Sequence, residues 1–408
     1  MLGLIRRNAQ FRLFWIGQTA SMLGNYALPV ALALFAALHF RSVSAVGLVL
    51  AARALGSVIM LLIGGALADM WDRRKLMIVS DVARLLLVAV LATSPGSLSL
   101  TVLVCLLLGC GEGLFYPAYN AFTVELVPPE DRQSANSLNS IGVQTAAVAA
   151  PALAAVVVAW SGTTLLFVVD ALTFAVSLVT LVAVRRAVEP RPAGEGAGLR
   201  ALGASIIGGF QEIRKRRWIG FMIGQDAVNT GFAYGPVAVL LPLLLLERGH
   251  GPAVFAAIAA FSAAGSIVGG FLGSLVKTRS PGIWACVLAS LFAAYTFAIA
   301  LGAPPGWLMA LAAISSMGSE LGLVLWYTSL QRDVPESMLS RINSVDWTGS
   351  MSLRPIGQAA TGPVAALVGS SPLLLGAGVV VAVTTLLPLL SADVRAFRTS
   401  STKVEAQL

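Results

Sequence analysis

Charged side chains are too scarce in this chain to cover a water-exposed surface. Asp, Glu, Lys and Arg make up 11% of its 408 residues, whereas soluble proteins carry about 25%. Hydrophobic residues make up 57%. A chain of this composition cannot coat soluble domains of its size with polar groups, so the sequence predicts an integral membrane protein.

Long apolar segments predict the number of membrane-spanning helices. A helix needs about 20 apolar residues to cross the hydrocarbon layer of a bilayer. Twelve segments of suitable length follow one another: 12–38, 45–68, 75–94, 98–122, 136–160, 163–184, 218–246, 253–276, 282–302, 305–330, 344–368 and 372–391. We therefore expect an all-α integral membrane protein.

One connecting segment differs from the short, turn-rich links between the other spans. Residues 187–216 contain prolines, glycines and several charges, which is typical of a polar linker. The sequence therefore predicts an N-terminal six-helix bundle (1–186), a cytoplasmic linker (187–216) and a C-terminal six-helix bundle with a short cytoplasmic tail (217–408).

The basic residues predict the orientation of the chain. With the N-terminus in the cytoplasm, 22 of the 27 Lys and Arg residues lie inside and 2 outside, as the positive-inside rule requires. The same distribution explains the net charge of +8 without a nucleic-acid partner. The excess of Arg over Lys is typical of a GC-rich bacterial gene, so we expect a bacterial cytoplasmic (inner) membrane with both termini cytoplasmic.

The two halves of the chain are related by an internal repeat. A shift of 207 residues aligns segment 16–34 with segment 223–241, with 9 of 19 positions identical, and pairs Gln18 with Gln225 and Pro29 with Pro236. A shift of 208 pairs Glu112 with Glu320. Since each half has an even number of predicted spans, both halves have the same orientation, and the repeat is parallel.

The loop between the second and third spans carries a recognisable motif. Residues 65–75 read GALADMWDRRK, which resembles the G-x-L-x-D-x-x-x-R-[KR] signature of the major facilitator superfamily. Segments 7–15 and 126–140 resemble the macrolide-efflux and enterobactin-exporter-like branch of that family. The resemblance implies a secondary transporter that works by alternating access. It also implies that Asp69, Arg73 and Arg74 latch the two halves in the outward-facing state.

Two departures set this chain apart from typical drug antiporters in the superfamily. Cys105 stands where those proteins often carry an Arg in the fourth span. In the fifth span, alanines replace the glycines that surround a proline equivalent to Pro151. Both departures weaken an interpretation as a drug/proton antiporter.

Three acidic residues lie within the spans that line the central cavity in this superfamily, which are spans 1, 4, 7 and 10. They are Glu112, Asp226 and Glu320. Ionisable groups inside a membrane are costly and are therefore functional candidates. Polar and aromatic residues on the same spans complete the predicted substrate- and proton-binding site: Asn25, Tyr26, Tyr116, Tyr119, Asn229 and Tyr327.

Structural roles are the alternatives for several of these residues. Asp226 could pair with Arg354 in span 11, and Glu112 could be a packed structural acid between two glycines. Asp81 and Arg84, three residues apart, are expected to form a local pair. Asp170 lies off the cavity-lining spans and is interpreted as structural. The tyrosines could be ordinary packing residues.

The function that the resemblance implies is proton-coupled efflux of a hydrophobic or amphipathic small molecule, cationic compounds included. The alternatives are a lipid or lysolipid flippase, a siderophore or nutrient carrier, and a non-transporting membrane receptor. We expect a monomer whose partners are the substrate, protons and the bilayer. We expect no enzyme activity, cofactor or metal site, because the sequence has no GxxxxGK[ST] loop and no CxxC pair.

Overall fold

The computed structural model describes residues 2–93, 96–184, 211 and 213–397. Contacts divide the chain into two compact units. The first unit contains Met1–Leu202 together with Gly249–Ala256, and the second contains Gly203–Arg248 together with Ala257–Leu408. Most of the predicted linker, 187–216, lies outside the described residues, so the predicted domain boundaries stay a prediction.

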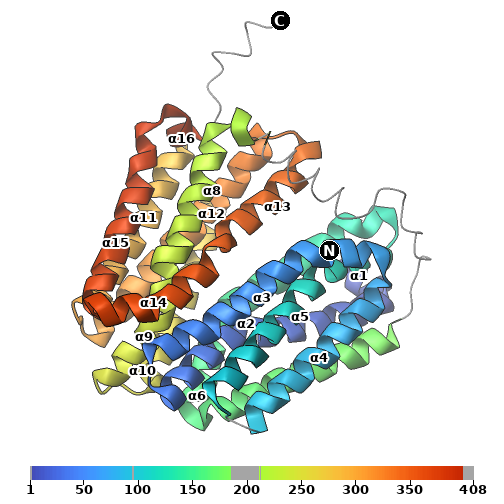
Figure 1. Cartoon of the computed structure of the whole chain (residues 1–408). Coiled ribbons are helices and arrows are strands. Elements are labelled where there is room, and N and C mark those ends of the chain that lie inside the picture. The colour runs from blue at the N-terminus through green and yellow to red at the C-terminus, as the bar shows by residue number, and fades with distance from the viewer. Residues whose placement is uncertain (1, 94–95, 185–210, 212, 398–408) are drawn as a thin grey trace, which may run out of the picture. The chain divides into compact units, whose positions relative to one another are not determined.

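The first unit is built from helices α1 to α6 (Figure 1). Their bounds are Leu2–Arg7 for α1, Ala9–Phe40 for α2, Val43–Met70 for α3, Arg73–Thr93 for α4, Leu98–Glu125 for α5 and Arg132–Ala183 for α6. A short 3-10 turn, Pro129–Asp131, leads into α6. Within this unit α3 packs against α5, α2 against α6, and α4 against both α5 and α6.

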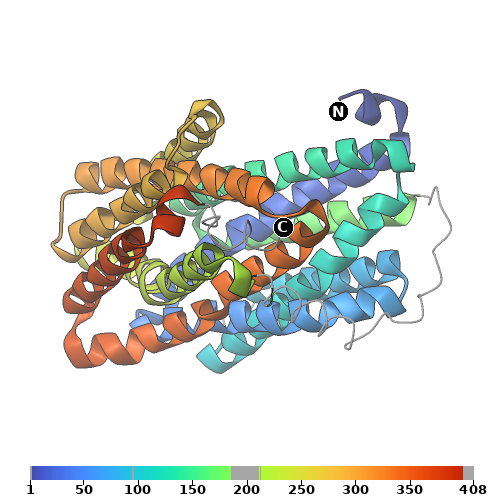
Figure 2. The same cartoon turned by 90° about the horizontal axis from the view of Figure 1, so that it is seen from above.

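The second unit is built from α8 and the helices that follow it (Figure 2). Their bounds are Arg217–Asn229 for α8, Gly235–Glu247 for α9, Pro252–Leu275 for α10 (in this unit from Ala257), Pro281–Ala300 for α11, Pro305–Asp333 for α12, Glu336–Ser352 for α13, Arg354–Val368 for α14, Ser370–Leu386 for α15 and Ala392–Ala396 for α16. A π-helical turn, η2 (Thr230–Tyr234), joins α8 to α9, and a 3-10 turn, η3 (Leu387–Leu390), follows α15.

The described part of the chain is helical, as expected of the predicted class. Ten of its helices are long and apolar enough to cross a membrane. One of them, Pro129–Ala183, is 55 residues long and breaks at Gly162, where φ is +76°. The predicted spans 136–160 and 163–184 meet at this break. The predicted span 344–368 corresponds to α13 and α14 and is not among the ten, so the count of twelve stays a prediction.

Local sequence signals explain where several helices begin. Asn8 caps α2, with its side-chain oxygen accepting from the Phe11 amide at 2.9 Å. Ser42 and Ser97 cap α3 and α5 in the same way. Pro281 and Pro305 stand at the first positions of α11 and α12, where a missing N–H is harmless.

Glycines bring α3 and α5 into backbone contact. A Cβ atom on Gly109 would lie 1.9 Å from the Arg53 carbonyl oxygen, and one on Gly113 would lie 2.3 Å from that of Ser57. In the second unit, a Cβ atom on Gly269 of α10 would lie 2.2 Å from the Met317 carbonyl oxygen of α12. Small residues allow this close approach of helices in a membrane. Glycine contacts of the same kind therefore pack α5 on α3 in the first unit and α12 on α10 in the second.

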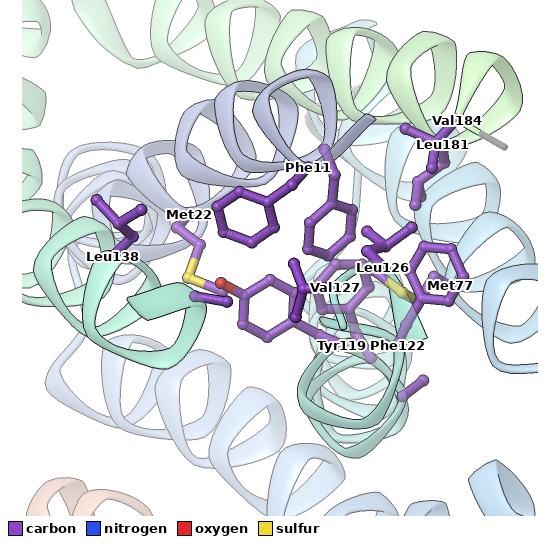
Figure 3. Packing of buried hydrophobic residues seen from close by; sticks show 14 of the residues in the cluster. Phe11, Met22, Met77, Tyr119, Phe122, Leu126, Val127, Leu138, Leu181 and Val184 are labelled. Carbon is purple, nitrogen blue, oxygen red and sulfur yellow. The ribbon is translucent and has the colours of Figure 1, made fainter. Parts of the chain in front are cut away.

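Each unit has a core of large side chains at one end of its helices. In the first unit Phe11, Phe122 and Met77 pack with residues of α5 and α6 (Figure 3). In the second unit Trp218 stacks on Phe397 with ring centroids 5.1 Å apart, and Trp326 meets the same ring edge-on at 5.8 Å. These aromatic contacts attach the short helix α16 to α8 and α12.

Candidate substrate and proton-coupling site

Glu112 lies in a polar network inside the first unit. Its carboxylate pairs with Arg53 of α3 at 2.9 Å and accepts from the Asn25 amide of α2 at 3.2 Å. Arg53 also donates to the Asn25 carbonyl oxygen at 3.2 Å. The network therefore ties α2, α3 and α5 together, and the Arg53 partner was not predicted from the sequence.

The three tyrosines predicted near Glu112 and Asn25 have different environments. Tyr116 contacts the Asn25 amide at 3.5 Å and hydrogen-bonds with Tyr26. Tyr119 stacks on Phe14 at 5.6 Å and is 4% exposed, within the hydrophobic core. Tyr116 therefore belongs to the polar network, whereas Tyr119 has the packing role left open as the alternative. The predicted binding role of these tyrosines stays a prediction.

Asp81 and Arg84 form the predicted local ion pair on α4. The second Asp81 oxygen accepts from the Ser177 hydroxyl of α6 at 2.6 Å, and Ser177 accepts in turn from the Gln18 amide of α2 at 2.9 Å. Arg84 lies between the rings of Phe115 and Phe174, 4.4 and 4.6 Å from their centroids. The pair is therefore held by α2, α5 and α6 as well as by its own helix.

Asp226 of α8 lies on the surface of the second unit, next to an acid that sequence reasoning missed. That acid is Asp346 of α13, close enough for the two charges to interact. Ser350, one turn along α13, hydrogen-bonds with both carboxyls. Trp326 of α12 donates its indole N–H to Asp346 at 3.1 Å. The signal that could have found Asp346 was its position within a predicted span.

The alternative pairing of Asp226 with Arg354 is not what the structure shows. Among the described residues, the ion pairs include none between these two side chains, and Arg354 approaches the Met351 sulfur at 4.0 Å. The sequence suggested the pair because both residues lie in spans. The two charges could not be matched without knowing how α8 and α14 are rotated.

Glu320 and Tyr327 lie on α12 within the same unit. Glu320 is half-buried, and its Cγ lies 3.7 Å from where a Cβ on Gly270 of α10 would be. Tyr327 is 40% exposed and interacts electrostatically with Asp226, Glu320 and Asp346. These three acids are therefore neighbours of one exposed phenol ring. Among the described residues, the ion pair of an acid in this unit is that of Asp333 with Arg216, and it involves none of the three.

Asn229, predicted as a binding residue, uses its side chain in a hydrogen bond to another helix. It is 4% exposed, and its oxygen accepts from the Thr384 hydroxyl of α15 at 2.7 Å. The adjoining π-helical turn is in contact with α14, where a Cβ on Gly357 would lie 1.7 Å from the Gly231 carbonyl oxygen. This contact and the hydrogen bond pack the middle of the seventh span against α14 and α15.

The arginines of the loop motif, Arg73 and Arg74, bind the C-terminal ends of α5 and α6 in the first unit. Arg73 pairs with Glu125 at the end of α5 at 2.8 Å, and Arg74 donates to the carbonyl oxygens of Leu181 and Val182 at 2.6 and 2.5 Å. A cation here is favourable because the C-terminus of α6 carries partial negative charge. Asp69 lies in the last turn of α3, and its side chain is outside the description. The latch itself stays a prediction.

These features indicate a membrane transport protein before any relative is considered. Apolar helices long enough to span a bilayer carry buried charges, and such charges in membrane helices mark transport pathways. The match to known families agrees. Residues 14–358 match the family model of the Major Facilitator Superfamily, and the chain belongs to this family.

Relatives with assigned names extend over the whole chain. An enterobactin exporter EntS from Citrobacter koseri is 27% identical over 416 residues, covering 97% of this chain and 95% of the relative. An EntS from Escherichia coli O1:K1 / APEC is 26% identical over 424 residues, covering 99% and 97%. The chain is thus a multi-pass membrane transporter for a small molecule, not an enzyme, and exporters are among its relatives.

Solved structures share the fold. A POT family transporter in complex with a thioalcohol-conjugated peptide has a TM-score of 0.72 at 14% identity, covering 93% of this chain and 95% of that one. A bacterial homologue of the human lysosomal transporter Spinster, inward-facing and unoccupied, has a TM-score of 0.67 at 15% identity, covering 96% of each chain. At these identities the likeness concerns the fold alone.

Proposed function

We propose that this transporter exports an amphipathic small molecule across the bacterial inner membrane in exchange for protons. The observation that carries the proposal is the group formed by Asp226, Glu320 and Asp346, which has no ion pair among the described residues of the second unit. Carboxyl groups in membrane helices are retained where they bind substrates or relay protons. Unpaired carboxyls can take up and release a proton without first breaking an ion pair.

The substrate class follows from the surroundings of these carboxyls and from the named relatives. The exposed ring of Tyr327 offers an aromatic face beside the acids, which suits ring-containing or cationic groups. Relatives named as enterobactin exporters cover nearly the whole chain. We therefore propose a siderophore-type compound as the first substrate to test, and an amphipathic organic cation as the second.

The test uses the full chain purified and reconstituted in liposomes loaded with enterobactin. Acidifying the outside should accelerate loss of enterobactin several-fold over liposomes at equal pH, and a protonophore should abolish the difference. The same liposomes loaded with ethidium provide the test of cation export. Protein-free liposomes correct for passive leak.

The other candidate functions predict different results in the same system. Transbilayer movement of a fluorescent lysolipid, with neither enterobactin nor ethidium transported, would support a flippase and contradict the proposal. Export that proceeds equally well with and without a pH difference would contradict proton coupling. Binding of either compound without transport would favour a receptor.

A further inference from the structure

Five charged side chains from four helices lie within the interior of the first unit. Four of them form two ion pairs, Arg53 with Glu112 and Arg84 with Asp81. The fifth is Asp170 of α6, which interacts electrostatically with Arg84, Arg53 and Glu112. Three acids therefore face two arginines, and the group carries one negative charge too many if every acid is ionised.

Asp170 is the acid without an arginine partner. It is 2% exposed, and none of the ion pairs among the described residues involves its carboxylate, beside which the Thr173 hydroxyl lies. The Thr173 hydroxyl, one turn along, donates its proton to the backbone carbonyl of Asp170 at 2.7 Å. Gly24 of α2 comes so close that a Cβ there would lie 2.2 Å from an Asp170 carboxylate oxygen and 2.3 Å from the Thr173 hydroxyl oxygen. The carboxyl is thus enclosed by protein.

Arg84, which interacts electrostatically with Asp170, has a side-chain N–H group without an acceptor. Arg84 is 2% exposed, and its Nε atom has no acceptor although its terminal nitrogen pairs with Asp81. Its guanidinium carbon lies 4.4 and 4.6 Å from the ring centroids of Phe115 and Phe174. The first unit thus contains a buried donor and two buried acceptors that are not joined to each other.

We propose that Asp170 is a proton-binding site of the first unit, and that loss of its proton draws Arg84 from Asp81 to Asp170. Burial of an unpaired carboxylate is so unfavourable that the group takes up a proton instead. When the proton leaves to water, Asp170 becomes an anion and competes with Asp81 for Arg84. The proton on Asp170 therefore selects which acid the arginine holds.

This exchange would couple protonation to helix movement inside one bundle. Asp81 is linked through Ser177 and Gln18 to α6 and α2, so release of Arg84 loosens the contacts among α2, α4 and α6. Arg53 of α3, which pairs with Glu112 of α5, is the other cation that interacts with the Asp170 charge. The inference rests on the proposed proton-coupled transport and names a residue that would carry the proton.

The experiment is infrared difference spectroscopy of the purified full chain, which needs no substrate. At neutral pH the wild-type spectrum should contain a protonated-carboxyl band that Asp170→Asn removes. Glu130→Gln, which alters an exposed acid of the same unit, should leave that band intact. Identical carboxyl bands in wild type and Asp170→Asn would overturn the proposal, because Asp170 would then be ionised in this state.

A second variant, Asp81→Asn, tests the movement of Arg84 from Asp81 to Asp170, and this test can be made even if Asp170→Asn does not fold. Asp81→Asn deprives Arg84 of its carboxylate, so Arg84 should pair with Asp170 and the protonated-carboxyl band of Asp170 should disappear at the same pH. Persistence of the band in Asp81→Asn would overturn the exchange.

Transport assays separate this inference from the proposed function. Asp170→Asn, fixed in the neutral form, should lose gradient-driven export while retaining exchange of substrate between equal pools. If wild-type export ignores the pH difference but the Asp170 band is present, proton coupling of transport fails and the proton site stands. If export is proton-driven and the band is absent, the proton site fails and the proposed function stands.

Discussion

Asp346 changes the interpretation of Asp226. The sequence predicted a binding site that includes an acid on the seventh span, Asp226, and another on the tenth, Glu320. The structure instead brings Asp226 next to Asp346, with Ser350 hydrogen-bonded to both carboxyls. The two carboxyls are close enough for the charge of Asp226 to act on Asp346, so we propose that the proton uptake of one depends on the other.

Replacing either member of this pair should remove proton-driven export. We expect Asp226→Asn and Asp346→Asn each to lower export against a gradient to near the rate of protein-free liposomes, because an amide keeps the size of the side chain but carries no exchangeable acid proton. Exchange at equal pH should survive. Glu247→Gln, an exposed acid at the end of α9, is the control. Wild-type export by both amide variants would shift the proposed coupling role to Glu320.

Spacing along a single helix accounts for two further contacts at the scale of residues. Glu112 and Tyr116 share a face of α5 because they are four residues apart, and both meet Asn25. The ion pair of Asp81 and Arg84 follows from their spacing on α4. Arg53 was not matched to Glu112, since that contact depends on how far α3 and α5 slide along each other.

At the scale of helices, close packing sets the sliding position of α3 on α5. Gly109→Val should destabilise the protein, because its Cβ would meet the Arg53 carbonyl oxygen at 1.9 Å. Overpacking of this kind costs about 1–3 kcal/mol. Gly376→Val on α15 is the control, since a Cβ there has no atom within 4 Å. Thermal unfolding in detergent measures both, and equal melting temperatures would contradict this packing.

The attachment of α16 gives a second prediction at this scale. Phe397 is fully buried against Trp218 and Trp326. Removing a buried Phe ring costs about 3–5 kcal/mol, so Phe397→Ala should lower the melting temperature clearly. Leu387→Ala, whose side chain is 59% exposed, should change it little. Intrinsic Trp fluorescence should rise or shift in the first variant, and unchanged fluorescence would show that the aromatic cluster does not hold α16.

At the scale of the whole molecule, residues that the repeat pairs have similar surroundings in the two units. Gln18 and Gln225, paired by the repeat, are both buried, and both have a side-chain oxygen without a partner in the structure. Glu125 and Asp333 also correspond, since a shift of 208 joins them, and each holds an arginine at the end of its span. The superposition that should pair Gln18 with Gln225 and Pro29 with Pro236 stays a prediction.

The latch is the prediction that belongs to the whole transporter. We expect Asp69 to lie near the start of span 11 in the outward-facing state, so Asp69→Asn should weaken cytoplasmic closure. A cysteine placed at Met70, which is 65% exposed, reports the change in a background where Cys105, Cys110 and Cys286 are replaced by Ala. Labelling from the cytoplasmic side should become several-fold faster. Glu130→Gln should leave the rate unchanged, and an unchanged rate in Asp69→Asn would rule out the latch.

The sequence alone determined the class of the protein, most spans and the repeat, because each depends on composition and spacing along one chain. A run of about 20 apolar residues has few alternatives to a membrane helix. Tertiary structure decided which charges meet. Asp346 beside Asp226, Arg53 beside Glu112 and the unpaired carboxyl of Asp170 all depend on the rotation and sliding of neighbouring helices, and a shift of a single residue turns a helical side chain by about 100°. Hydrophobic patterns locate a helix in the bilayer but leave that rotation to side-chain packing.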